Sequence, residues 1–513
     1  MIANLMALSV RARWAVVLLF LVIAGFGAWQ LTKLPIDAVP DITNNQVQIN
    51  TVERGLSPIE IEKRVTFPIE TALAGIPGLE TTRSLSRNGF SQVSAIFTDK
   101  TDLYFARQQV SERLTQARDT LPDGVQPQIG PVTTGLGEVL MYSVDFANPG
   151  GKGATVRNGQ PGWQSDGSFL TPEGARLTDE VGRAAYLRTV QDWIIRPQLR
   201  TVKGVAGIDS IGGYAKQYIV EPDPVKLSSY GISYSELAKA LEASNLAVGA
   251  NYFNRGGEAF LLRADARIRD IDEIADAIVA TRGGLPIAVK DVANVKIGGE
   301  LRTGAASQNG HEAVIGTALM LIGENSRVVA RNVGERLDGI GKSLPPGIKV
   351  TTVLDRSKLV NATVATVQRN LIEGAILVAA ALFLLLGNVR AAIIAVLIIP
   401  FSFLMMAIGM NAFRVPGNLM SLGALDFGLI VDGAVIIIEN CLARLAHRQE
   451  HEGRLLNLRE RLEETMRASQ EMIKPTVFGQ GIILLAFAPL LMFTGVEGKT
   501  FSRDSLEMDR ILA

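Results

Sequence analysis

The charged residues of this 513-residue chain are distributed very unevenly. Residues 371–442 contain only six of them, although Asp, Glu, Lys and Arg make up 20% of the whole chain. A stretch so poor in charge and so rich in Leu, Ile, Val and Ala is typical of helices in a lipid bilayer. The sequence therefore predicts a membrane part, joined to a second part that carries most of the charge.

Five segments are apolar enough to cross the hydrocarbon core, which takes about 20 residues of helix. They are residues 14–34, 371–386, 391–412, 418–441 and 475–494. A cleaved signal peptide is the alternative for the first segment, but that segment is long and contains Trp29 and Gln30. We therefore predict five transmembrane helices.

Basic residues near the ends of the spans predict their orientation, because Lys and Arg accumulate on the cytoplasmic side. Arg11 and Arg13 precede the first span, and Arg390 lies between the second and third. This orientation makes residues 1–13 a cytoplasmic N-terminus and places residues 35–370 outside the membrane.

The segment between the fourth and fifth spans carries seven Lys or Arg. Residues 443–474 combine these charges with regularly spaced leucines, which predicts a cytoplasmic amphipathic helix on the inner membrane surface. A solvated connecting helix is the alternative.

The external part contains two pairs of similar segments. Residues 68–80 (PIETALAGIPGLE) align with residues 197–209 (PQLRTVKGVAGID) at an offset of 129, and residues 110–125 align with residues 333–348 at an offset of 223. In each pair an amphipathic helix ends at a Gly or Pro turn that leads into a strand. This pattern predicts two copies of a ferredoxin-like split βαβ plan.

The different offsets predict an insertion in the second copy. We place the first α/β module at residues 35–136, the second at 137–222 and 292–360, and an inserted subdomain at 223–291. The predicted fold is therefore an α-helical membrane protein with five spans plus an external α+β domain of two ferredoxin-like modules, the second carrying an insertion. In the second copy we expect strands at 205–211 and 217–221, and we expect residues 148–168 to form an exposed loop or, alternatively, a mobile gate.

The fourth span contains the strongest chemical signal, the run GALDFGLIVDGAVIIIEN at residues 423–440. It carries Asp426, Asp432 and Glu439 in an otherwise apolar helix, in which Asp432 and Glu439 lie about 20° apart around the axis. Carboxyl groups in a membrane usually face a protein interior or a water-filled path, and burial favours their protonated form. Proton transfer is the predicted role; protonated or ion-paired structural acids and direct metal coordination are the alternatives.

Three small residues in the same run, Gly423, Gly428 and Gly433, predict close packing of a neighbouring helix. Other candidates carry weaker signals. Four methionines could form a thioether relay for Cu(I), but we favour ordinary apolar packing for Met405, Met406, Met410 and Met420. The spacing of four residues could let two histidines hold a metal, but we favour a surface pair for His447 and His451.

Several classes of protein are disfavoured. A net charge of zero gives no basic footprint for nucleic acid, and the single cysteine, Cys441, excludes an internal disulfide framework. Phosphate-binding, nucleophile-elbow and zincin motifs are absent from the sequence, so we expect no ATP hydrolysis by this chain and an ion gradient or another subunit as the energy source. We expect a transporter with no enzyme activity and no cofactor.

Taken with these features, the chain resembles the N-terminal half of the resistance-nodulation-division (RND) efflux pumps, specifically the heavy-metal class of the cobalt-zinc-cadmium and nickel type. The motifs that carry the resemblance are EGAILV at 373–378, LGNVRAA at 386–392, DFGLIVDGAVIIIEN at 426–440 and PTVFGQGIILLAFAPLLMFTGVEGKTF at 475–501.

The resemblance implies a proton antiporter of the inner membrane that exports divalent cobalt, zinc, cadmium or nickel. It identifies Asp426, Asp432 and Glu439 as the proton relay, the two α/β modules as periplasmic porter modules and residues 223–291 as a docking-type subdomain. It further implies a homotrimer that works with a periplasmic adaptor and an outer-membrane channel. It does not identify the residues that bind the metal.

One segment departs from the family pattern. Residues 495–513 end in the polar stretch RDSLEMDRILA, where the family continues into a sixth span and a second copy of the whole plan. We therefore expect residues 495–513 to be the tail of a truncated chain. Two alternatives to metal export remain open. The truncation suggests a fragment that does not transport, and the wider superfamily includes RND exporters of drugs or other small molecules.

Overall fold

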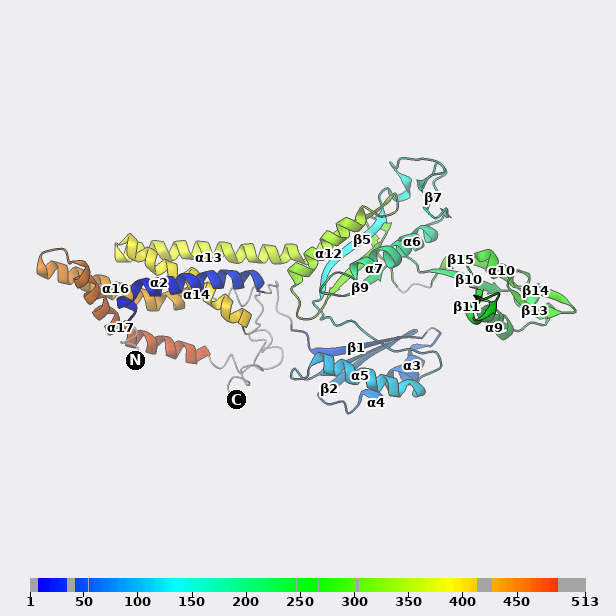
Figure 1. Ribbon diagram of the computed structural model, residues 1–513, viewed down its shortest axis with the longest axis horizontal. Coiled ribbons are helices and arrows are strands. Elements are labelled where there is room, and N and C mark those ends of the chain that lie inside the picture. Colours follow the sequence, from blue (N-terminus) through cyan, green and yellow to red (C-terminus); the bar gives the residue numbers. More distant parts are fainter. Residues whose placement is uncertain are drawn as a thin grey trace.

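The computed structural model describes residues 8–34, 42–53, 55–245, 247–265, 267–300, 304–412 and 427–487. The molecule is elongated, with long helices side by side at one end and the α/β parts at the other (Figure 1). The long helices are α2 (Arg13–Lys33), α13 (Arg356–Leu386), α14 (Val389–Ala412), α16 (Phe427–Glu452) and α17 (Leu458–Phe487).

Within the described residues, three helical stretches are long and apolar enough to span a membrane: Arg13–Lys33, Arg356–Ala381 and Val389–Ala412. The predicted spans 418–441 and 475–494 each lie partly outside the described residues. Helix α13 begins well before the predicted span at 371–386 and runs without a break from the α/β part into the helical part (Figure 1). Gly387, with a φ of 60°, ends this helix, and Asn388 caps the start of α14 through the N–H groups of Arg390 and Ala391.

Helices α2 and α14 pack closely because a glycine removes the side chain between them. A Cβ added to Gly27 would lie 2.7 Å from the carbonyl oxygen of Leu404. Asn411 Nδ2 donates a hydrogen bond to Gln30 Oε1 across the same interface. Small residues and polar pairs of this kind hold helices together where lipid removes the hydrophobic driving force.

The first α/β module is a four-stranded sheet covered on one face by helices. Its strands stand in the order β2-β3-β1-β4. Alternate residues of β1, such as Val47 and Ile49, are fully buried beneath the helices, and Ser57 starts the first helix with a capping box to Glu60. The elements in chain order are β1 (Asn45–Val52), α3 (Pro58–Ile61), η1 (Glu62–Thr66), α4 (Phe67–Leu73), β2 (Leu79–Arg87), β3 (Phe90–Phe97), α5 (Leu103–Ala117), η2 (Arg118–Thr120) and β4 (Gln128–Ile129).

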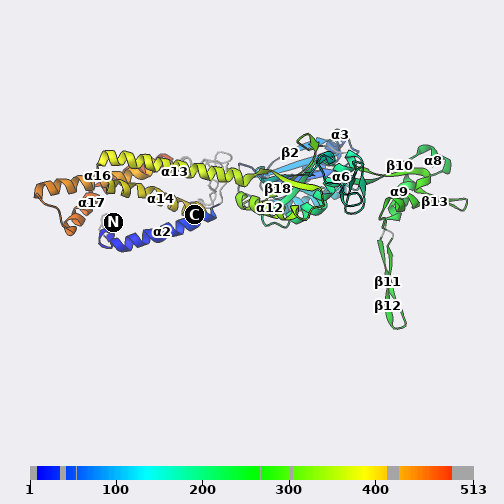
Figure 2. The ribbon, with the colours of Figure 1, turned by 90° about the horizontal axis from the view of Figure 1, so that it is seen from above.

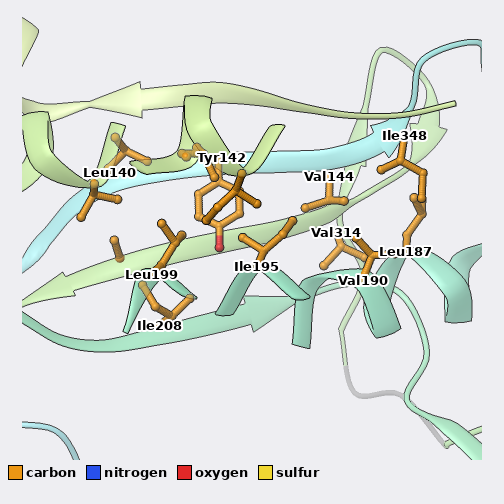
Figure 3. Close-up of a cluster of buried hydrophobic side chains, with 14 of the residues drawn as sticks. Leu140, Tyr142, Val144, Leu187, Val190, Ile195, Leu199, Ile208, Val314 and Ile348 are labelled. Carbon is orange, nitrogen blue, oxygen red and sulfur yellow. The ribbon is translucent and has the colours of Figure 1, made fainter. Parts of the chain in front are cut away.

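The second module has the same order of elements, with the sheet order β19-β5-β18-β9. Its core surrounds Tyr142 of β5, which lies between the sheet and the helices together with Ile195 and Leu199 (Figure 3). Burial of each large apolar side chain contributes roughly 1.5–3 kcal/mol. The elements are β5 (Glu138–Phe146), α6 (Glu180–Thr189), η4 (Val190–Ile195), α7 (Arg196–Leu199), β9 (Val205–Ile211), β18 (Val314–Met320), α12 (Ser326–Gly341) and β19 (Ile348–Asp355).

Both modules interrupt their first helix with a π-helical turn. The turn η1 comes just before Pro68, and the turn η4 comes just before Pro197. Proline has no N–H to donate, and its ring clashes with the carbonyl four residues earlier in a regular α-helix. The wider turn accommodates the proline, so the similarity at an offset of 129 extends to local backbone geometry.

The insertion in the second module is longer than the sequence analysis places it. The strand beside β9 is β18, whereas residues 217–221 belong to β10 (Lys216–Pro222), which pairs with β15 (Ala293–Gly299) outside the sheet. Residues 212–313 therefore separate the two halves of the module. Both predicted strands, 205–211 and 217–221, are present, but the assignment of 217–221 to the second module is wrong, because this strand belongs to the insertion. The error arises because β10 follows β9 after a short glycine turn, just as β3 follows β2.

The pair β10 and β15 forms an arm that carries the inserted subdomain away from the module, and the hairpin of β11 and β12 projects further still (Figure 2). A small core around Leu227 and Val292 holds the subdomain together. Its elements are α8 (Pro224–Tyr230), α9 (Tyr234–Ser244), β11 (Ala247–Arg255), β12 (Glu258–Asp265), α10 (Ile271–Asp276), β13 (Ile278–Arg282), β14 (Leu285–Ala288) and α11 (Val289–Val292). The short strands β16 (Ser307–Gln308) and β17 (His311–Glu312) lie on the way back to β18.

Residues 148–168 are largely exposed, as their composition predicts, but they also contain short regular elements and a buried aromatic anchor. They contain η3 (Pro149–Gly151) and β6 (Gly162–Trp163), and β6 pairs with β7 (Phe169–Leu170), which pairs with β8 (Arg176–Leu177). Trp163 is 4% exposed and lies against Phe146 and Phe169 with ring centroids 5.4 Å apart in both pairs. One aromatic anchor among many glycines thus fixes the segment to the second core.

Candidate functional site

Helix α16 contains the described part of the acidic run. Its first residue is Phe427, so Gly423 and Asp426 lie outside the described residues. Asp432 lies in the second turn of the helix, and Glu439 lies one heptad later. Seven residues of α-helix turn the chain by almost two full turns, so positions 432 and 439 are on the same side of α16.

One side of α16 packs against α17. A Cβ added to Gly433 would lie 3.0 Å from Thr476 Cγ2 and 3.8 Å from Gln480 Nε2. Further along, Asn440 Nδ2 donates a hydrogen bond to the Ala468 carbonyl at 3.0 Å. The absence of a side chain at Gly433 therefore sets how closely the two helices approach beside position 432.

A second side of α16 packs against α14. Val435 and Ile438 contact a small core of buried alanines and Ile399 from α14. Val378 of α13 completes this cluster. The contact is entirely apolar, which separates it chemically from the mixed interface with α17.

A third side of α16 is not covered by the helices described here. Ile436 is 45% exposed, and Glu439 is also exposed. Positions 432, 436 and 439 fall on this side by helical periodicity. Glu439 thus lies on a face of α16 that the described helices leave open, where a carboxyl group can exchange a proton with water or with another polar group.

The predicted amphipathic helix at 443–474 is two helices instead of one. Helix α16 ends at Glu452 before Gly453, whose φ is 63°, and α17 starts at Leu458. Asn457 caps α17 by accepting a hydrogen bond from the Glu460 N–H at 3.0 Å. The leucine spacing continues across this turn, which explains why the sequence alone suggested one helix.

Charged side chains join the two arms of this hairpin. Glu464, with a side chain only 10% exposed, lies 3.3 Å from Arg444 and 3.0 Å from Arg448. At the turn, Arg454 donates to both oxygens of Glu460 at 2.9 and 2.8 Å, which lowers the pKa of that carboxyl to about 2. The hairpin therefore holds the end of α16 in a fixed orientation.

Other candidate residues occupy ordinary structural positions. Met410 is buried beside Leu34, with Met406 packed against this pair, while Met405 is half exposed. His447 and His451 lie on the last turns of α16, and no group of three His, Cys, Asp or Glu that could hold a metal occurs within the described ranges. Met420 lies outside those ranges.

The sequence analysis did not single out Thr476 and Gln480, the polar residues of α17 that lie nearest Gly433. A signal for them existed, because both belong to the predicted fifth span, where polar side chains are rare. Their spacing of four residues places them on one side of α17.

A bundle of long apolar helices joined to two α/β modules defines a membrane protein with a large domain outside the bilayer. Residues 5–507 match the family model described as the AcrB/AcrD/AcrF family, and the chain belongs to this family. Together with the relatives described next, this match confirms the resemblance to RND heavy-metal efflux pumps.

Individual relatives show which kind of transporter within this family the chain is similar to. The chain is 63% identical to the nickel-cobalt-cadmium resistance protein NccA of Alcaligenes xylosoxydans xylosoxydans over 98% of its own length and 47% of the relative. It is 49% identical to the cobalt-zinc-cadmium resistance protein CzcA of Cupriavidus metallidurans, over 98% and 45% of the two chains. A crystal structure of a heavy metal efflux pump is 33% identical, with a TM-score of 0.81 over 98% of this chain and 46% of the other. The chain thus spans about half the length of these relatives.

Proposed function

We propose that the protein exports divalent heavy-metal cations across the cell envelope in exchange for protons, as the N-terminal half of an inner-membrane RND transporter. The observation that supports this proposal is that α16 carries two acidic positions, 432 and 439, one heptad apart on the same side of an otherwise apolar helix, with Glu439 exposed. Transporters commonly use intramembrane carboxyl groups as proton carriers.

In this proposal Asp426, Asp432 and Glu439 form the proton relay. A carboxyl group in apolar surroundings binds a proton more tightly than in water, and it releases the proton when the surroundings become polar. Movement of α16 relative to its neighbours changes those surroundings. Gly433 allows such movement against α17, and Gly423 and Gly428 have the same packing role in the proposal.

The proposed substrate is a divalent cation of the cobalt, nickel, cadmium or zinc group. Cobalt and cadmium occur in the names of both relatives, at 63% and 49% identity, while nickel occurs in the name of the more similar one. The metal is cargo in this proposal and not a resident cofactor.

We also propose that the chain crosses the membrane five times and that both α/β modules are ferredoxin-like porter modules. The first inference is supported by the continuation of α16 and α17 into the apolar segments 418–441 and 475–494. The second is supported by the strand orders of the two sheets. The order β2-β3-β1-β4 of the first module matches β9-β18-β5-β19 of the second, strand by strand in chain order.

The assembly we propose is a homotrimer with a periplasmic adaptor and an outer-membrane channel. The hairpin of β11 and β12 supports this proposal. It forms a two-stranded sheet of its own, and such a hairpin is only marginally stable in water unless it packs against something else, here another chain of the assembly. Tyr252 on this hairpin is 63% exposed. The inserted subdomain takes the docking role in this assembly.

A resistance assay tests the proposal. We expect the full-length protein to restore growth of a metal-sensitive host on cobalt or nickel, and we expect Asp432→Asn to abolish this effect while the protein remains in the membrane. Asp338→Asn on the exposed face of α12 is the matched control, since it makes the same change far from the helical bundle. Unchanged resistance in Asp432→Asn would disprove the relay, and protection against hydrophobic toxins without protection against metals would disprove the substrate class.

A further inference from the structure

A polar network lies at the point where the inserted arm leaves the second module. Asp192 of the π-helical turn η4 accepts a hydrogen bond from Arg188 Nε at 2.6 Å and one from Ser210 Oγ at 2.8 Å. Arg196 lies 3.6 Å from the same carboxylate. Gln191 Nε2 extends the network by donating to Ser210 Oγ at 3.1 Å.

Arg188 connects this network to the base of the arm. Its Nη1 donates to the carbonyl oxygen of Gly212 at 2.9 Å, while its Nε binds Asp192. Gly212 is the first residue after β9, and the arm strand β10 begins four residues later. One guanidinium group therefore binds both the helix of the module and the backbone that leads into the arm.

The chain has almost no space to move at this exit. Gly212 and Gly213 have φ values of 83° and 65°. A Cβ at Gly212 would lie 2.5 Å from the Ala313 carbonyl oxygen, and one at Gly213 would lie 2.8 Å from the Ala184 carbonyl oxygen. The outgoing chain is thus pressed between α6 and the returning chain before β18, and Arg188 holds it there.

The same region contains buried polar atoms that lack a hydrogen-bond partner among the described residues, namely Gln191 Oε1 and Arg196 Nε. The hydroxyl of Tyr142 lies in the core beside them, and burial raises the pKa of this phenol.

We propose that the network of Arg188, Asp192 and Ser210 is the joint that fixes the direction of the inserted arm, and with it the orientation in which the second module presents the inserted subdomain. The functional part of this inference rests on the proposed function, in which the inserted subdomain docks against another chain. The geometric part, that Arg188 holds the arm, stands on the contacts alone.

The test measures the direction of the arm in the full-length protein. Spin labels are placed on cysteines introduced at Asp338 of α12 and at Ser228 of α8, in a background without Cys441, the only cysteine of the sequence. Double electron–electron resonance then gives the distribution of distances between module and subdomain. The key variant is Arg188→Lys, which can keep the ion pair with Asp192 but lacks the forked guanidinium whose second nitrogen reaches the Gly212 carbonyl at the same time.

We expect Arg188→Lys and Ser210→Ala to broaden this distribution. Arg176→Lys is the matched control, because Arg176 also forms an ion pair at 2.6 Å, with Asp166, but does not contact the arm. An unchanged distribution in Arg188→Lys, or equal broadening in Arg176→Lys, would overturn the proposal. Since the measurement does not depend on transport, an unbroadened Arg188→Lys together with an inactive Asp432→Asn would reject the joint and leave the proposed function standing.

Discussion

Replacement of Gly433 by alanine tests the contact between α16 and α17 beside the acidic positions. The new Cβ would lie 3.0 Å from Thr476 Cγ2, well inside an ordinary contact distance between carbon atoms. Overpacking of this kind costs about 1–3 kcal/mol, whereas a Gly to Ala change in an open helical position gains up to about 1 kcal/mol. We therefore expect Gly433→Ala to be less stable than a matched open-site variant by roughly 1–3 kcal/mol.

Gly479 on α17 is the matched site, because a Cβ added there meets no atom within 4 Å. Thermal unfolding of the purified full-length protein should give a lower Tm for Gly433→Ala than for Gly479→Ala. The double variant Gly433→Ala with Thr476→Ser should recover most of the difference, because serine lacks the methyl group that clashes. Equal Tm values for the two alanine variants, or no recovery in the double variant, would refute the packing described for this interface.

Three further predictions concern the modules and the hairpin. Gly316→Ala should destabilise the second module by more than 1 kcal/mol, because its Cβ would lie 2.2 Å from Tyr142 Cζ; chemical unfolding should show the loss, and Tyr142→Ala in the same chain should reduce the additional cost. Trp163→Ala should cost about 3–5 kcal/mol and should free residues 148–168 for limited proteolysis, whereas protection equal to the unmodified protein would contradict the anchor role. The ion pair of Glu460 with Arg454 should stabilise the hairpin of α16 and α17 fully above pH 4.5 and lose this effect as the pH falls towards 2, because the pKa of Glu460 is lowered from 4.5 to about 2 in the folded protein. Amide hydrogen exchange at residues 457–461 should therefore be slower in the unmodified protein than in Glu460→Gln at pH 6, and the two proteins should exchange at the same rate at pH 2.

The spans and the duplicated modules show what a sequence pattern can predict. Long apolar segments are recognised from composition alone, since lipid imposes helices of a known length. The duplication was visible because Pro68 and Pro197 follow equivalent helical turns and because both second helices end at similar Gly and Pro turns. Such patterns can be read from the sequence because the local backbone geometry depends on proline and glycine at these positions.

The errors of the sequence analysis have a common physical origin, because pairing between distant segments is not written in local patterns. Residues 217–221 have the pattern of a strand, but only the sheet shows that β18 takes the place beside β9. In residues 148–168 the glycines predict the exposed segment but not the contacts of Trp163 that attach it to the second core. In residues 443–474 the leucine period did not reveal the turn at Gly453.

The acidic run was recognised because carboxyl groups are costly in lipid. Its positions on α16 follow from helical geometry, but the three different environments around that helix do not. The polar neighbours Thr476 and Gln480 come from a helix more than 40 residues later in the chain. Only the antiparallel packing of α16 and α17 brings them to Gly433.

The most direct test of the proposed function is the coupling of metal movement to proton movement. The full-length protein is reconstituted into liposomes that contain a pH-sensitive dye, and a cobalt or nickel gradient is imposed across the membrane. We predict proton movement opposite to the metal in the unmodified protein and in Asp338→Asn, and no proton movement in Asp432→Asn. Metal movement without proton movement in the unmodified protein, or undiminished proton movement in Asp432→Asn, would contradict the account.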